Sequence, residues 1–318
     1  MGLRCFFATA LAGVFIANGC EAKAQQEFAA LDAVKSLKLP NRPGEVEVYY
    51  STCCRERAIE VQKNLEDYLR FYEKSLGIHV HFAVAVLDKN DWNRVDSQNP
   101  KQAGGPYGMT HWVGPPYVAF VPADDGGIIT QNLLRDRVHE TTESRALLAS
   151  VKMSFNEAAS KFILHPAMHE LGHRLLREFG IQIEGQESTA WFVEVLASYF
   201  AYAYEKERRP DLATIVEAVA KMSSPPVMYT APSDFTKTFR LMAAGDSSNF
   251  IWYQHQFEGR IVDVYARQGL GFLPTVNAAF SGQKGEIGSA ELMTSLEQAS
   301  PGFEAWFSHL ANLRTENR

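Results

Sequence analysis

Residues 162–173 read FILHPAMHELGH, and this stretch decides which fold we expect for the chain. It ends in the pattern His-Glu-x-x-His, formed by His169, Glu170 and His173. Residues one turn apart share a helix face, so the two imidazoles can bind one metal ion. Glu170 projects to the side of this pair, where it can reach a metal-bound water. Zinc suits this arrangement, because catalytic zinc sites combine such ligands with one open position. A helix with two unrelated histidines is the alternative.

The helix that carries this motif is expected to begin close to Pro166, since proline is tolerated in a first helical turn. His165 would then be a cap or first-turn residue, and Gly180 should end the helix. Gly172 lies inside the expected helix, where glycine is about 1 kcal/mol less favourable than alanine. Close approach of another backbone would explain a glycine at this position.

A second helix, from Ala190 to about Glu205, is expected to supply the third ligand. Its sequence is nearly apolar all round, which predicts burial. Glu194 lies in its middle, and a buried carboxylate without a partner is costly. A metal ion resolves that cost, so Glu194 is the candidate ligand; Glu187, just before the helix, is the alternative. Ser198 lies on the same face as Glu194 and could orient a ligand.

These two segments resemble the motifs of one enzyme family. Residues 191–200, WFVEVLASYF, resemble the pattern W-x-x-E-G-x-A-x-Y-F of the peptidase MA-like members of the gluzincins. Gluzincins are thermolysin-like zinc metallopeptidases whose third ligand is a glutamate. Val195 departs from the usual glycine, which affects the expected approach of backbone to substrate but not metal binding. The resemblance covers only residues 169–200 of the 318.

The resemblance implies an enzyme that hydrolyses peptide bonds with zinc-activated water and Glu170 as the general base. It also implies a second donor to the oxyanion, for which Tyr253 is the candidate and His255 the alternative. Packing of Tyr253 in the core is an equally open interpretation. A peptide or protein substrate would pair with an edge strand, for which Tyr117–Val121 or Tyr107–Val113 could serve.

The fold class expected is α+β and zincin-like, with a cleft that holds zinc. Residues 25–185 should form a sheet-containing part that ends in the motif helix, and residues 186–318 a helical part with the third ligand. Strands are expected at Val46–Tyr50, Ile78–Leu87 and Tyr117–Val121, and a helix at Ala58–Leu76. His79 and His81 would share a solvated strand face.

The N-terminus, residues 1–24, has the pattern of an export signal. Arg4 precedes a largely apolar run at residues 5–17, and small residues precede Gln25. A rival interpretation makes Cys20 a lipid-anchored cysteine. The protein is therefore expected to be periplasmic or secreted, and the apolar run is too short for a stable membrane span.

Two adjacent cysteines, Cys53 and Cys54, remain after removal of the signal. Export permits disulfides. Adjacent cysteines can bond only through a strained eight-membered ring, however, so free thiols partly buried at a strand end are the favoured interpretation.

Composition limits the other function classes. The chain is 46% hydrophobic and 21% charged, as in a folded globular protein, and its formal net charge is −6. No long basic run is present, so nucleic-acid binding is not expected. A zinc-bound pseudopeptidase that acts as a periplasmic binding module is the main rival to the peptidase, although a mere metal holder has no need of Glu170.

Overall fold

The computed structural model describes residues 30–98, 107–109, 111–113, 118–181, 189–223, 227–243, 246–280 and 287–316. The chain forms two compact units. One contains the described residues up to Arg135 together with Ala159–Leu171, and the other contains Asp136–Ala158 and the described residues from Gly172 onward. The predicted signal peptide, with Cys20, and the predicted boundary between residues 185 and 186 lie outside the described residues.

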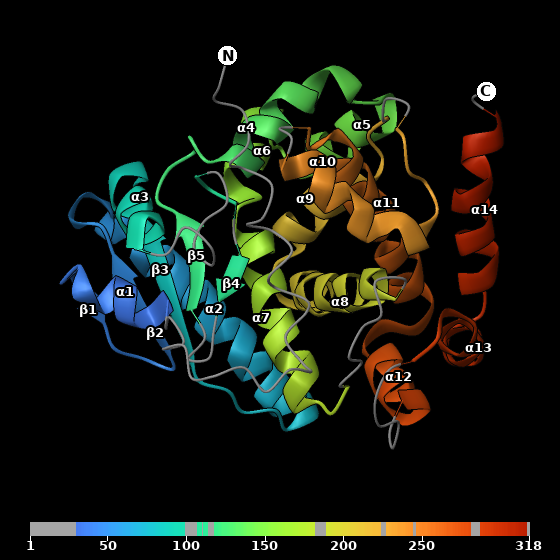
Figure 1. Ribbon diagram of the computed structural model, residues 1–318, viewed down its shortest axis with the longest axis horizontal. Coiled ribbons are helices and arrows are strands. Elements are labelled where there is room, and N and C mark those ends of the chain that lie inside the picture. Colours follow the sequence, from blue (N-terminus) through green and yellow to red (C-terminus); the bar gives the residue numbers. More distant parts are fainter. Residues whose placement is uncertain are drawn as a thin grey trace, which may run out of the picture. The chain divides into compact units, whose positions relative to one another are not determined.

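The first unit is built on a five-stranded mixed sheet with the strand order β1-β2-β3-β5-β4 (Figure 1). The strands are β1 (Asn41–Arg42), β2 (Val46–Tyr50), β3 (Phe82–Leu87), β4 (His111–Val113) and β5 (Val118–Pro122). The three central strands β2, β3 and β5 are parallel, and β1 and β4 pair antiparallel at the two edges. The central strands are almost entirely buried, as parallel strands usually are.

Helices cover this sheet. Helices α1 (Ala30–Ser36) and α3 (Lys89–Gln98) contact each other and contribute to one apolar cluster with every second residue of β3, including Ala85. The intervening residues, such as Val84, point to the opposite side. The long helix α2 (Arg55–Leu76) packs against β2 and ends at Gly77, whose φ of 70° suits a glycine.

Most of the predicted elements of this unit are present. The strand Val46–Tyr50 is confirmed, and the helix predicted at Ala58–Leu76 is confirmed with an earlier start at Arg55. The strand predicted at Ile78–Leu87 is too long, because β3 begins only at Phe82. His79 and His81 therefore do not share a strand face. Instead, Nδ1 of His79 lies 3.2 Å from Oε1 of Glu73, and the two imidazole rings meet edge to face.

The strand order also decides between the two segments predicted to pair with substrate. Strand β5 is hydrogen-bonded to β3 on one side and to β4 on the other, so it offers no open edge. The prediction for Tyr117–Val121 as an edge strand is therefore wrong for the described part of that segment. Strand β4, within the Tyr107–Val113 segment, lies at the edge of the sheet.

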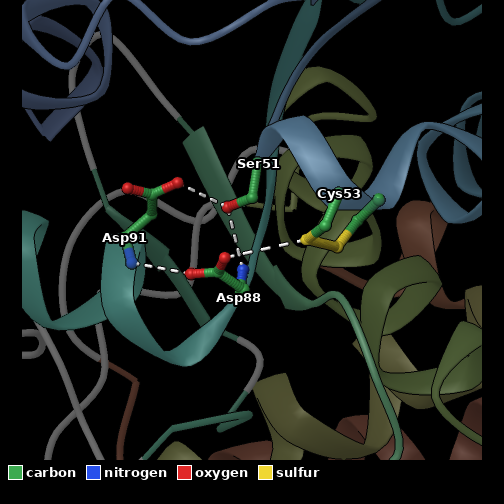
Figure 2. The surroundings of a disulfide bond; sticks show 5 residues. Ser51, Cys53, Asp88 and Asp91 are labelled. Carbon is green, nitrogen blue, oxygen red and sulfur yellow. Dashed lines mark hydrogen bonds between the residues drawn. A yellow bond between two sulfur atoms is a disulfide. The ribbon is translucent and has the colours of Figure 1, made fainter.

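The two adjacent cysteines form a disulfide (Figure 2), so the favoured prediction of free thiols is wrong. That prediction placed Cys53 and Cys54 at a strand end, where neighbouring side chains point to opposite faces. The chain has already left β2 at this point, and both cysteines belong to the 3-10 turn η1 (Thr52–Cys54).

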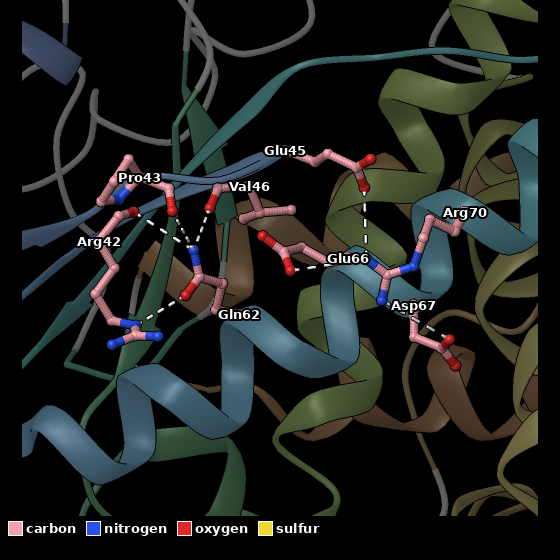
Figure 3. Close-up of polar contacts among 8 residues, drawn as sticks. All are labelled: Arg42, Pro43, Glu45, Val46, Gln62, Glu66, Asp67 and Arg70. Carbon is pink, nitrogen blue, oxygen red and sulfur yellow. Dashed lines mark hydrogen bonds and ion pairs between the residues drawn. The ribbon is translucent and has the colours of Figure 1, made fainter.

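A buried glutamine joins α2 to the sheet (Figure 3). The side-chain amide of Gln62 donates to the carbonyls of Val46 at 2.9 Å and Pro43 at 3.2 Å, and its Oε1 accepts from Nε of Arg42 at 2.8 Å. Gln62→Leu keeps the size but leaves a buried carbonyl without its donor. We expect the free energy of unfolding to fall by about 1–2 kcal/mol, measured by urea denaturation.

Arg70, on the same helix, provides the matched control. Its guanidinium lies 3.7 Å from Glu45, 3.8 Å from Glu66 and 4.0 Å from Asp67, and it is half exposed (Figure 3). Exposed ion pairs of this kind contribute between zero and about 1 kcal/mol. Arg70→Ala should therefore shift the urea midpoint less than Gln62→Leu does. Equal losses for the two variants would contradict the role given to Gln62.

The second unit is helical. Helix α8 (Ala190–Arg208) is buried from Ala190 to Glu205 except at Val193, and it contacts both α9 (Pro210–Ala220) and α11 (Ser248–Gln268). The further helices and 3-10 turns described in the chain are α4 (Ile128–Arg135), η2 (Asp136–His139), α5 (Thr142–Ser150), α6 (Phe155–Lys161), α7 (Leu164–Glu178), α9 (Pro210–Ala220), η3 (Pro232–Lys237), α10 (Thr238–Ala243), α11 (Ser248–Gln268), η4 (Gly269–Gly271), α12 (Phe272–Phe280), α13 (Ser289–Ala299) and α14 (Phe303–Glu316).

The predicted α+β class is confirmed, since a small mixed sheet precedes a mainly helical remainder. No helix among the described residues has both the length and the apolar character that a membrane span requires.

Candidate metal centre

The motif helix is α7, Leu164–Glu178, which begins two positions before Pro166. It ends close to Gly180, whose φ of 90° favours a glycine, as predicted. His165 lies in the first turn, is buried, and stacks on the ring of Phe162 with 5.4 Å between the ring centroids. The first-turn position predicted for His165 is therefore confirmed.

His169 and His173 lie one turn apart on α7, and both are about nine-tenths buried. Glu194 lies on α8 and is equally buried. Its Oε1 is 3.7 Å from Nε2 of His173. The predicted helix around Glu194 and its burial are thus confirmed.

These three side chains form a group that could hold a metal ion. Each of His169, His173 and Glu194 offers one ligand atom, and the three atoms lie within 4.8 Å of one another. Two imidazoles and one carboxylate fit a zinc ion that keeps a fourth position open. Among the described residues this is the only such group of three or more, whereas the alternative ligand Glu187 lies outside them.

Close approach of α7 and α8 holds two of these ligands near each other. A Cβ atom added at Gly172 would lie 2.5 Å from the carbonyl oxygen of Ala197 and 3.0 Å from its Cα. Real Cβ atoms do not come so close to backbone, so only glycine fits at this crossing. The predicted backbone contact is confirmed. Gly172 directly precedes His173, and Ala197 lies three positions after Glu194.

Two other predicted site residues are buried, and both lie close to a ligand along the sequence. Glu170 directly follows His169 on α7 and is 9% exposed, which leaves the carboxyl group little access to bulk water. Ser198 lies one turn after Glu194 on α8 and is fully buried. Their roles as general base and as orienting residue stay predictions.

Tyr253 has a clear packing role. Its ring is fully buried against Phe235 and Phe257, and its hydroxyl donates to the carbonyl of Ala231 at 2.5 Å. Burial raises the pKa of this hydroxyl, with a smaller contribution from Asp234, so the phenol is neutral. Its role as an oxyanion donor stays a prediction, while the structure shows the packing that the sequence left open.

His255, the alternative oxyanion donor, lies two residues further along α11. Burial lowers the pKa of His255 to about 4; His139 lowers it further and Glu258 acts in the opposite direction. The imidazole is therefore neutral at pH 7. Its Nδ1 has no hydrogen-bond partner among the described residues.

Comparisons of the chain with protein-family models, with curated proteins and with solved structures found no match.

Proposed function

We propose that the protein is a zinc-dependent metallopeptidase of the gluzincin type with a zincin-like fold. The observation that carries the proposal is the group of His169, His173 and Glu194, which combines the right ligand types within 4.8 Å. Glu170, next to the first ligand, adds the general base that hydrolysis needs and that a protein which only binds the metal does not need.

The side chains have distinct roles in this proposal. His169, His173 and Glu194 would hold the ion. A bound zinc ion would supply a Lewis acid that polarises the substrate carbonyl and lowers the pKa of a water to about 7. Glu170 would accept a proton from the attacking water and return it to the leaving amine. Burial of all four side chains keeps bulk water from competing for these protons.

The substrate in this proposal is an extended peptide or a protein segment. An edge strand can pair with such a chain through backbone hydrogen bonds, and β4 has the position in the sheet that this requires. The export pattern of residues 1–24 supports a periplasmic or secreted enzyme.

The direct test measures zinc first and hydrolysis second. We expect the purified protein to bind about one zinc per chain, and zinc at ~100 times its dissociation constant to stabilise the fold by about 2.7 kcal/mol. A broad peptide library, read by mass spectrometry, should show cleavage that a chelator stops and added zinc restores. Failure to bind zinc would refute the metal site, whereas zinc binding without cleavage of any peptide would favour the binding module.

A further inference from the structure

The Cys53–Cys54 disulfide lies at the carboxyl ends of two neighbouring parallel strands (Figure 2). Strand β2 ends at Tyr50 and leads into the turn that contains both cysteines. Strand β3 ends at Leu87 and leads to Asp88. Cys53 is exposed and Cys54 is partly buried, so the two sulfur atoms differ in their access to solvent.

A carboxylate faces the exposed half of the disulfide. Oδ2 of Asp88 lies 3.7 Å from Sγ of Cys53 (Figure 2). A disulfide sulfur carries no proton, so this contact becomes a hydrogen bond only when Cys53 is a thiol that donates to Asp88. The surroundings of Cys53 are therefore suited to the reduced state as well as to the oxidised one.

Asp88 is held in this position by the ends of both strands. Its Oδ1 accepts from the backbone N–H of Asp91 at 2.8 Å, in the manner of a helix cap for α3. Its own N–H donates to Oγ of Ser51 at 3.0 Å, and that hydroxyl donates to Oδ2 of Asp91 at 2.7 Å. These hydrogen bonds fix the position of the Asp88 carboxylate beside Cys53.

The other cysteine occupies the start of a long helix. Cys54 is the N-cap residue of α2, a helix of 22 residues, and its side chain makes no capping hydrogen bond. The first N–H groups of a helix lack partners within it, and they favour a thiolate placed there. Reduction would place a thiolate at this helix end, where the N–H groups can stabilise its negative charge.

We propose that Cys53–Cys54 is a redox-active disulfide that reacts with small-molecule thiols, which attack Sγ of Cys53 and release Cys54 as the thiolate. Two features favour attack on Cys53 over attack on Cys54. Exchange requires access to the attacked sulfur, and Cys53 is the more exposed of the two. Exchange is faster when the leaving thiolate is stabilised, and the N-terminus of α2 does this for Cys54.

The exchange takes place in two steps. A thiolate RS⁻ forms a bond to Sγ of Cys53 while the Cys53–Cys54 bond breaks, which leaves a mixed disulfide on Cys53 and a thiolate on Cys54. A second RS⁻ attacks the sulfur of R in the mixed disulfide and releases RSSR and Cys53 as a thiolate. Two thiols are thus oxidised, the cysteine pair gains two electrons, and solvent protonates Cys53, which then donates to Asp88.

Trapping of the first step tests the direction of attack. The full-length protein is treated briefly with glutathione, quenched in acid, alkylated, and mapped by tandem mass spectrometry. We expect glutathione on Cys53 and the alkyl group on Cys54. Glutathione mainly on Cys54, or a disulfide that dithiothreitol leaves intact in the folded protein, would overturn the proposal. The site requires neither zinc nor peptide hydrolysis, so this test is independent of the proposed enzymatic activity.

Removal of the nearby charge tests the role of Asp88. Asp88→Asn keeps an oxygen that can accept from Asp91 N but removes the negative charge beside Cys53. We expect exchange with glutathione to become about fivefold faster at low salt, the effect of one unit charge at ~4 Å in water, and the difference to shrink near ~1 M salt. Asp67→Asn, further along α2, removes the same charge away from the sulfur and should leave the rate unchanged. Equal rates for all three proteins would overturn the role of Asp88.

Discussion

Glu170→Gln is expected to abolish hydrolysis while the protein keeps its zinc. Glutamine has nearly the same size as glutamate and cannot accept a proton at neutral pH. General acid–base catalysis by one side chain accounts for about 100- to 10,000-fold in rate, so we expect kcat/KM to fall by about 1,000-fold or more. Zinc content should stay at the wild-type value, because Glu170 is not among the three ligands.

Two histidine variants make this result interpretable. His169→Ala removes a ligand and should lose both zinc and hydrolysis. His81→Ala removes an exposed histidine far from the motif in sequence and should change neither. If Glu170→Gln and wild type cleave a peptide at equal rates, Glu170 is not the general base. If neither protein cleaves any peptide of a broad library although both bind zinc, the protein is a binding module.

The ligand group could be predicted because its chemistry is local in sequence. One helical turn fixes the relation between His169 and His173 without any knowledge of the tertiary structure. Glu194 could be chosen because a lone acid in an apolar helix needs a partner. Gly172 was informative for a similar reason, since a glycine that weakens its helix must be explained by a close contact.

Other features depend on contacts that the sequence does not display. The β-forming residues in 78–87 begin before the strand itself, so the sequence predicts too early a start for β3. The disulfide was missed because the expected strand end at Cys53 is a 3-10 turn. The packing of Tyr253 could not be distinguished from catalysis, because a buried aromatic cluster and an active-site tyrosine both place the residue on an amphipathic helix.

Gly172→Ala is expected to destabilise the protein by up to about 2 kcal/mol, although alanine is the better helix former. Helix propensity favours the substitution by about 1 kcal/mol. The new methyl group, however, would lie 2.5 Å from the carbonyl oxygen of Ala197, and the atoms that it meets are backbone atoms that cannot rotate away. Overpacking of this kind typically costs about 1–3 kcal/mol and occasionally more, so the steric term wins.

Gly259→Ala is the matched control for this prediction, because a Cβ atom at that glycine, within α11, meets nothing within 4 Å. It should gain up to about 1 kcal/mol in urea denaturation. Gly172→Ala should also weaken zinc binding, since α7 and α8 must separate at the crossing that keeps His173 3.7 Å from Glu194. A Gly172→Ala protein as stable as wild type and with unchanged zinc affinity would show that the crossing can relax. If Gly172→Ala loses both stability and zinc affinity while Gly259→Ala loses neither, a single glycine sets the distance between the two ligand helices.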